Sequence, residues 1–251
     1  MKISKKVLLI GGSGNLGSTI LNSKLFQKIS APSKRKLNLL KKNTIRKILK
    51  KNFDIIINCA AIARMKECDA NPKIAIDVNI SGVLNLVEEI IHYNNNNAKK
   101  IKLIHISTDA VYSSIKGNYS EKDIPKPYNV YGWTKLCGEN FIKFLDDFVI
   151  IRTRFFNKKK IIYNTAAKDI FTSMIEINKL AKEIKKISLT SFNGIINIGE
   201  RKNSDYLNYK KYKKNIKPCF RKDIMKNLNF IIAKDASLNL NLHKKIKKKY
   251  V

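Results

Sequence analysis

The sequence predicts an α/β protein built on a doubly wound parallel sheet, with a small C-terminal lobe. Two observations support this fold class. Apolar, strand-like runs alternate with helical stretches along the chain, which is the pattern of a parallel sheet with helices on both faces. Most of these runs also lack the alternation of apolar and polar residues that a half-exposed strand shows, as expected for strands buried on both sides.

The expected strands are short and rich in Val, Ile, Leu and Phe. They cover residues 7–10, 55–58, 101–106, 148–151 and 195–198, with a weaker second strand over 28–31. Helices are expected over residues 16–25, 44–51, 74–93, 130–145 and 175–186. Right-handed crossovers would bring the carboxyl ends of the strands to one edge, where ligands bind in such sheets.

A glycine-rich turn follows the first strand directly, over residues 11–17 (GGSGNLG). The spacing GxxGxxG allows a tight turn and places backbone N–H groups and a helix N-terminus close to a pyrophosphate. The alternative is a plain turn between a strand and a helix, because glycine also marks ordinary turns. In this context we interpret it as a Rossmann-type dinucleotide site. Its expected members are Gly11, Gly14, Asn15, Leu16 and Gly17.

The segment after the second strand indicates which dinucleotide binds. NAD-preferring enzymes usually place an acidic residue there for the ribose hydroxyls. This chain has Ser33, Lys34 and Arg35 instead, a hydroxyl and two cations. They predict binding of the 2′-phosphate of NADP(H), with Arg35 the better bidentate partner. The alternative is an ordinary basic loop in a lysine-rich protein.

Two further stretches predict proton transfer. Ser107, Thr108 and Asp109 end a strand, and Tyr131 and Lys135 lie one helical turn apart, so the phenol and the ammonium should share a face. A nearby cation lowers the pKa of a phenol, and we expect Lys135 to do so for Tyr131. Such a tyrosine can exchange a proton with a substrate oxygen while a nicotinamide moves hydride. The alternative is a core aromatic beside a solvated lysine.

In order along the chain, these motifs resemble the extended short-chain dehydrogenase/reductase family, and within it the dTDP-4-dehydrorhamnose reductases and related nucleotide-sugar reductases. Residues 54–61 (DIIINCAA) are similar to the family's cofactor-facing strand and turn, and residues 77–86 to its long fourth helix. The subgroup is also matched by Gly138-Glu139 and by a set of residues before Tyr131: Lys116, Gly117, Tyr119, Glu121, Pro125, Pro127 and Asn129. The resemblance covers residues 5 to about 155 and is thin afterwards.

The resemblance implies NADPH-dependent reduction of a 4-keto nucleotide sugar, with dTDP-4-dehydro-L-rhamnose the best single substrate. The catalytic residues would be Thr108, Tyr131 and Lys135. Tyr131 would protonate the oxyanion and Thr108 would hydrogen-bond it. Tyr131 and Lys135 would also belong to the cofactor site, with Lys135 binding the nicotinamide ribose. One alternative is an epimerase of the same superfamily. Another is a non-catalytic, NADP-binding regulatory subunit.

Further residues are expected to bind these ligands. The cofactor site would include Cys59, Ala60, Ala61 and Asn79, although Asn79 could equally be a buried polar tie. For the substrate we expect Thr108, Asp109 and Arg152. Asp109 could bind sugar or cap the following turn, and we favour the cap. Arg152 could meet the phosphates of the substrate or pair with a carboxylate.

The resemblance divides the chain into an NADP(H)-binding domain over residues 1–157 and a small substrate-binding lobe over 158–251. The lobe is expected to return partly to the sheet, through the strand over 195–198. It is short compared with what the family leads us to expect, which leaves the identity of the sugar open.

The composition limits the other classes of function. The net charge of +32 would attract phosphates, but the lysines are spread along a chain also rich in Asn and Ile, and no nucleic-acid motif accompanies them. We therefore do not expect a nucleic-acid partner. No run approaches the roughly 20 apolar residues of a membrane span, and the basic start is followed by too short an apolar run for a signal peptide.

The cysteines and histidines predict no metal site. The four cysteines form no CxxC pair, and the three histidines share no metal-ligand spacing. We expect reduced cysteines and a cytoplasmic protein, with a homodimer left open.

Overall fold

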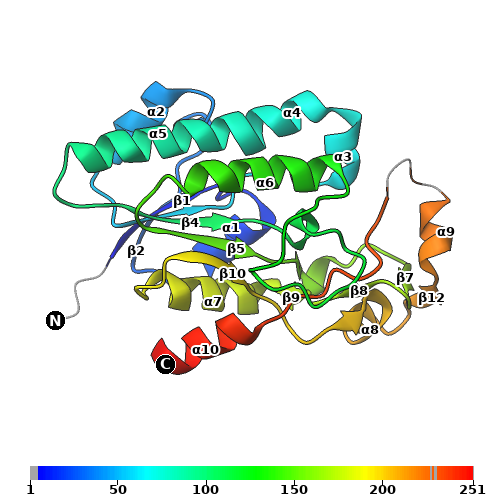
Figure 1. Cartoon of the computed structure of the whole chain (residues 1–251). Coiled ribbons are helices and arrows are strands. Elements are labelled where there is room, and N and C mark those ends of the chain that lie inside the picture. Colours follow the sequence, from blue (N-terminus) through cyan, green and yellow to red (C-terminus); the bar gives the residue numbers. More distant parts are fainter. Residues whose placement is uncertain (1–4, 227, 229–230, 251) are drawn as a thin grey trace.

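A six-stranded parallel sheet forms the centre of the molecule, in the order β10-β5-β4-β3-β1-β2 (Figure 1). The computed structural model describes residues 5–226, 228 and 231–250. The predicted α/β fold with a doubly wound parallel sheet is confirmed. The strands of this sheet are β1 (Lys6–Ile10), β2 (Lys28–Ser30), β3 (Ile55–Asn58), β4 (Lys102–Ile106), β5 (Phe148–Arg152) and β10 (Gly194–Asn197).

Helices cover both faces of the sheet (Figure 1). One face carries α2 (Lys42–Leu49), α5 (Gly82–Asn95) and α6 (Val130–Ile142); the other carries α1 (Asn15–Asn22), α7 (Ile177–Ser188) and α10 (Asn241–Tyr250). Short helical segments are α3 (Met65–Ala70), α4 (Pro72–Ile76), the π turn η1 (Asp77–Ser81), and the 3₁₀ turns η2 (Asp109–Val111) and η3 (Lys158–Lys160).

Alternate residues of each strand pack into different hydrophobic cores. In β1, Val7 and Leu9 contact the core under α1 and α7, whereas Leu8 and Ile10 contact the core under α2 and α5. Because both faces of the sheet are covered, both sets of side chains are apolar. This double burial explains why the strands show no alternation of polarity.

All five predicted helices differ in their bounds from the structure. Helices α1, α2 and α6 end two or three residues earlier than expected, and the other two helices are divided or begin late. The helix expected over 74–93 is divided into α4, the π turn η1 and α5. The π turn holds Asn79, whose side chain hydrogen-bonds the backbone N–H and carbonyl of Ile62. The helix expected from residue 175 begins at Ile177, because Ile175–Glu176 forms β9, which pairs with β6 (Phe155–Phe156).

The C-terminal lobe lies at the carboxyl edge of the sheet (Figure 1). It contains two small strand pairs, β7 with β12 and β8 with β11, and two short helices. Their bounds are β7 (Thr165–Ala167), β8 (Phe171–Thr172), β11 (Asn203–Ser204), β12 (Lys217–Cys219), α8 (Asp205–Lys210) and α9 (Arg221–Met225). Between these segments the chain returns to the sheet through α7 and β10.

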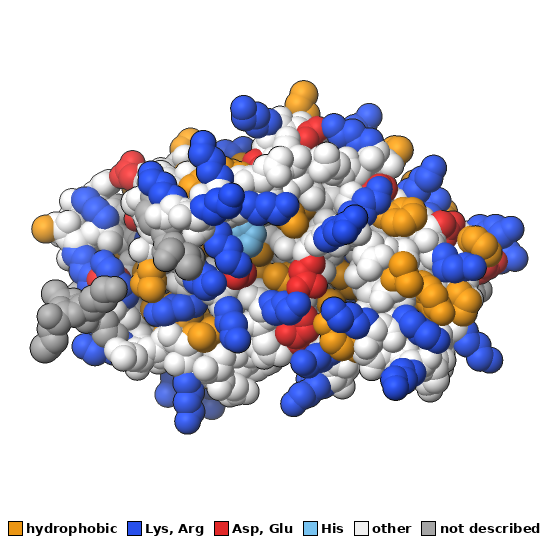
Figure 2. All heavy atoms as spheres, turned by 90° about the horizontal axis from the view of Figure 1, so that it is seen from below, with side chains coloured by type: hydrophobic (Ala, Val, Ile, Leu, Met, Phe, Trp, Pro, Cys, Tyr) orange, Lys and Arg blue, Asp and Glu red, His pale blue; other side chains and the backbone are white. Residues whose placement is uncertain are grey.

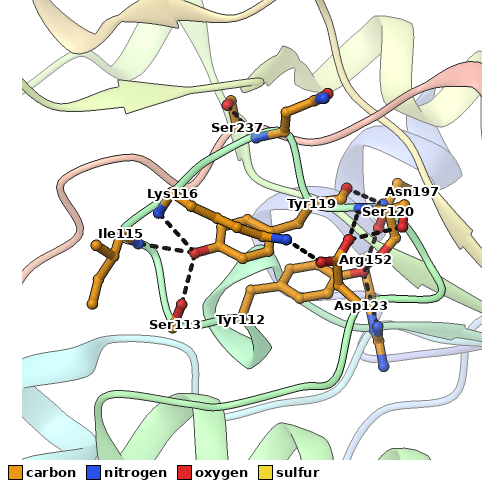
Figure 3. A network of polar contacts seen from close by, with 11 residues as sticks. Tyr112, Ser113, Ile115, Lys116, Tyr119, Ser120, Asp123, Arg152, Asn197 and Ser237 are labelled. Carbon is orange, nitrogen blue, oxygen red and sulfur yellow. Dashed lines mark hydrogen bonds and ion pairs between the residues drawn. The ribbon is translucent and has the colours of Figure 1, made fainter.

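A polar network ties the loop after β4 to the lobe (Figure 3). The rings of Tyr112 and Tyr119 stack with centroids 4.8 Å apart. The Tyr112 hydroxyl lies 3.1 Å from Oδ1 of Asn197 in β10, and the Tyr119 N–H donates to the carbonyl of Ser237 at 2.9 Å. These contacts join the loop after β4 to β10 and to the segment around Ser237, which are far apart in the sequence.

The basic side chains are spread over the surface. On the face seen in Figure 2, Lys and Arg side chains are interspersed with acidic and apolar ones and form no continuous stripe. No helix among the described residues is long and apolar enough to cross a membrane.

Candidate functional site

A cavity of about 720 Å³ lies between the carboxyl edge of the sheet and the lobe. Its volume is in the range of small-molecule and cofactor sites. The predicted site residues on its wall are Gly14, Asn15, Leu16, Gly17, Cys59, Ala61, Thr108, Asp109 and Tyr131. The expected dinucleotide side and the expected chemical side therefore share one cavity.

The glycine turn needs its glycines for two different reasons. Gly11 has φ +80°, and a Cβ there would lie 2.7 Å from the backbone N of Ala60. A Cβ on Gly17 would lie 2.1 Å from the carbonyl oxygen of Gly11. Helix α1 then starts at Asn15 with no side-chain hydrogen bond at its N-cap, so its first N–H groups remain available to an anionic ligand.

Tyr131 and Thr108 line the cavity together, from α6 and from the end of β4. Burial raises the pKa of the Tyr131 phenol above its ordinary value, and hydrogen bonding with Thr108 acts in the opposite direction. The expectation that Lys135 makes this phenol acidic is therefore wrong for the structure described. A raised pKa makes the phenol a weaker acid than an ordinary tyrosine, whereas a general acid works best with a pKa near the working pH.

Lys135 is buried and faces β4, not solvent. Its Nζ lies 3.0 Å from Nε2 of His105, whose Nδ1 lies 3.2 Å from Nδ2 of Asn58. The backbone N–H of Ala60 donates to Oδ1 of Asn58, which leaves only the amide NH₂ of Asn58 for His105. Nδ1 must then accept, and Nε2 carries the proton. The directions of these hydrogen bonds favour a neutral Lys135.

The electrostatics agree with that direction. Burial lowers the pKa of Lys135 to about 8, although Glu139 and Cys59 oppose the change. Burial, reinforced by the charge on Lys135, lowers the pKa of His105 well below its usual value. Lys135, a buried residue of α6, therefore loses its proton at a lower pH than an ordinary lysine.

The lowered pKa of Lys135 makes stability depend on pH. Between about pH 8 and the ordinary lysine value of 10.5, the unfolded chain holds a proton that the folded chain lacks, so stability should rise with pH in this window. Lys135→Met removes the effect. In urea unfolding, the free energy of unfolding of Lys135→Met, minus that of the wild type, should fall by about 2–3 kcal/mol between pH 7 and pH 10. Lys143→Met, at the end of α6, is the control. A pH-independent difference for Lys135→Met would contradict this prediction.

Asp109 forms an ion pair and not the expected cap. Its Oδ2 lies 2.7 Å from Nε of Arg154, and the carboxylate is 1% exposed. The cap of the turn η2 is Thr108, whose hydroxyl oxygen accepts from the N–H of Ala110 at 3.2 Å. Because Asp109 remains on the cavity wall, its predicted contact with substrate stays a prediction.

Arg152 does not reach the cavity. Its guanidinium is 1% exposed and donates to both carboxylate oxygens of Glu139, with Nη2 2.7 Å from Oε2. It also donates to the Tyr112 hydroxyl at 2.9 Å, within the network drawn in Figure 3. Of the two alternatives, pairing with a carboxylate is correct. The predicted contact with substrate phosphates is wrong, because the guanidinium of Arg152 is buried in the core against Glu139 and Tyr112.

Other predicted residues stand behind or beside the cavity. Asn79 is a buried polar tie, because its amide also donates to Oγ1 of Thr134 at 3.0 Å. Gly11 and Ala60 meet backbone to backbone under the glycine turn. Residues 33–35 form an exposed turn after β2, where their predicted contact with a 2′-phosphate remains a prediction.

Sequence reasoning missed the part of the wall that comes from the lobe and from the end of β5. These residues include Thr153, Arg154, Asp205 and Tyr209, and Tyr128 from the loop before α6 was missed as well. Arg154 could have been found, because it directly follows the carboxyl end of an expected strand. Asp205 and Tyr209 are one turn apart on α8, in a segment whose sequence carries no recognisable motif.

No metal centre is seen in this part of the chain. Within residues 5–226, 228 and 231–250, no group of three or more His, Cys, Asp or Glu side chains could hold a metal ion. Burial raises the pKa of the Cys59 thiol on the cavity wall to about 12, which makes it a poor nucleophile.

Comparisons with known proteins agree with this geometry. A family model described as the RmlD substrate binding domain matches residues 5–189. The chain is 32% identical to the methionine adenosyltransferase 2 subunit beta of Bos taurus over 154 residues, 55% of this chain and 43% of that protein. It is 27% identical to the dTDP-4-keto-6-deoxy-D-glucose reductase of Streptomyces niveus over 183 residues, 70% of this chain and 59% of the reductase. The chain thus spans about half the length of these curated relatives.

Among solved structures, the chain is similar to dTDP-4-dehydrorhamnose reductase from Bacillus anthracis in complex with NADP. The TM-score is 0.83 with 22% identity, and the match covers 98% of this chain and 93% of that one. At this level of identity the similarity shows a shared fold.

Proposed function

Because the chain belongs to the RmlD substrate binding domain family, we propose that it is an NADPH-dependent reductase of a 4-keto nucleotide sugar. The S. niveus relative named as a keto-sugar reductase and the B. anthracis structure in complex with NADP support this class of reaction and this cofactor. Within the class, dTDP-4-dehydro-L-rhamnose is the substrate we propose.

One observation carries the proposal. The N-terminus of α1, the hydroxyl of Thr108 and the phenol of Tyr131 face a single cavity. When bound, NADPH supplies the hydride. The N–H groups at the start of α1 bind its pyrophosphate, Thr108 hydrogen-bonds the substrate carbonyl, and Tyr131 donates its proton to the oxygen that becomes negative.

The test is to follow NADPH oxidation across a small panel of 4-keto nucleotide sugars at fixed enzyme concentration. We expect oxidation in proportion to added substrate, because a reductase consumes its cofactor. An epimerase regenerates its cofactor, so substrate conversion without net NADPH consumption would contradict the proposal.

Arg35 provides a test of cofactor choice. Arg35→Ala should raise the KM for NADPH by roughly 10–100-fold, the value of a lost charge-assisted contact, and leave the KM for NADH unchanged. Lys36→Ala, at the neighbouring exposed position, is the matched control. Comparable KM values for NADPH and NADH in the wild-type protein would contradict the proposed binding of the 2′-phosphate by residues 33–35.

A second candidate function is a regulatory subunit that binds NADP without turning it over. The similarity to the beta subunit of a methionine adenosyltransferase is the observation that favours it. NADPH binding detected by its fluorescence, with no oxidation on any nucleotide sugar in the panel, would support this reading over the reductase.

A further inference from the structure

A second cavity, of about 500 Å³, lies apart from the first cavity, the one that Thr108 and Tyr131 line. We call it the α8–α10 pocket, because α8, α10 and the loop after β10 supply most of its lining. Both helices lie along the lower side of the molecule in Figure 1. None of the described residues lines both cavities. The proposed reaction therefore leaves this pocket without a role.

Two elements separate the pocket from the first cavity. In β6 the neighbouring side chains of Phe155 and Phe156 point to opposite sides, and they line the first cavity and the pocket respectively. Asp205 and Tyr209, one turn apart on α8, line the first cavity, whereas Lys211 lines the pocket from the C-cap of the same helix. A ligand could therefore occupy the pocket without displacing one from the first cavity.

Three cations on the lining of the pocket have no carboxylate partner. Arg201, Lys211 and Lys244 are exposed, and within residues 5–226, 228 and 231–250 none of them forms an ion pair. They come from the loop after β10, the C-cap of α8 and helix α10. Because like charges around one space repel each other, an anion bound between them would be stabilised.

The carboxylates around the pocket do not neutralise these three cations. Glu200 is the one acidic side chain on the described lining, and it pairs with Lys179. Glu183, on α7, accepts from His243 at 3.0 Å and pairs with Lys247 at 3.2 Å. Each of these acids already has a basic partner of its own, so the pocket keeps an excess of positive charge.

The spread of the cations selects the kind of anion. A single phosphate could contact only part of a set that three elements contribute, whereas a chain of phosphates carries several charges along its length. Phe156 and Tyr212 add aromatic rings, with centroids 5.5 Å apart, against which a base can pack. We propose that the α8–α10 pocket binds a triphosphate chain, either inorganic or carried by a nucleoside. The inference is independent of the proposed function, because it concerns a different cavity.

Calorimetric titration of inorganic triphosphate and of ATP tests this inference. The protein carries one equivalent of NADP, which occupies the first cavity, and the salt concentration is about 0.15 M, where distant surface charges are largely screened. We expect each ligand to bind at one site per chain. Tighter binding of ATP would assign its base to Phe156 and Tyr212, and equal affinities would assign the site to the phosphate chain alone. Binding of neither ligand would overturn the inference.

A double variant locates the site. Arg201→Gln with Lys244→Gln removes two of the three cations and should weaken binding of both ligands by about 10-fold or more, through the loss of two charge-assisted contacts. Lys47→Gln with Lys50→Gln is the matched control, because it removes the same charge from exposed positions at α2, on the opposite face of the sheet. The control should change the affinity by less than about 2-fold. Equal weakening by the two double variants would show general attraction to a basic protein and would refute the proposed site.

A variant of the first cavity gives a second control. Arg154→Gln removes a cation from the wall that Tyr131 also lines, and it should leave the binding of inorganic triphosphate unchanged. Binding that is lost in Arg154→Gln but retained in the variant with Arg201→Gln and Lys244→Gln would place the anion in the first cavity, contrary to the inference. Turnover of NADPH does not enter these measurements, so this inference and the proposed function fail separately.

Discussion

Replacing Tyr131 by Phe is expected to reduce kcat by about 10²–10⁴-fold while NADPH affinity changes little. The substitution removes only the hydroxyl that donates the proton and keeps the ring that fills the cavity wall. Turnover is measured as NADPH oxidation with the active 4-keto sugar, and affinity as the quenching or enhancement of NADPH fluorescence. Both are needed, because a structural role for Tyr131 would reduce them together.

Tyr206→Phe is the matched control. Tyr206 lies on α8, outside the lining of the cavity, so its hydroxyl should not affect kcat. If Tyr131→Phe turned over at the wild-type rate, Tyr131 would not be the proton donor, and the proposed mechanism would have to be abandoned.

Arg152→Met is expected to cause the largest loss of stability, about 3–5 kcal/mol in the free energy of unfolding. The substitution removes the guanidinium that donates to both oxygens of the Glu139 carboxylate, which is 0% exposed. It also removes a donor to the Tyr112 hydroxyl and so weakens the network in Figure 3. Urea unfolding at neutral pH measures the change.

A double substitution tests the cause. Arg152→Met with Glu139→Leu should recover most of the loss, because replacing a buried pair as a whole costs far less than breaking it. Lys73→Met, at an exposed pair with Asp77, should cost less than about 1 kcal/mol. A loss for Arg152→Met as small as for Lys73→Met would show that the pair contributes little.

Local patterns were sufficient to predict the sheet and the glycine turn. Strands β1, β3 and β5 each contain a run of at least three consecutive apolar residues because both of their faces are buried, and residues 11–17 carry glycines where backbone atoms approach closely. The family resemblance is likewise confirmed by the family model. These features depend on neighbours in the sequence or on the burial of a whole element.

The partners of charged side chains could not be predicted in this way. The spacing of Tyr131 and Lys135 indicates a shared helix face, but the state of Lys135 depends on His105 in β4 and, through it, on Asn58 in β3. Arg152 and Arg154 are two residues apart and would share a face in a continuous strand. Because β5 ends at Arg152, Arg154 instead lines the cavity while Arg152 faces the core. Such contacts come from three-dimensional packing.

The network around Tyr119 implies an order of assembly. Residues 235–239 run beside the loop after β4, where Tyr119 forms a bridge with Leu238 and Asn239 N–H donates to the Tyr119 carbonyl. Five strands of the sheet precede this segment by more than 80 residues. During synthesis the first five strands of the sheet can therefore pair before residues 235–239, which complete the contacts of Tyr119, have been made.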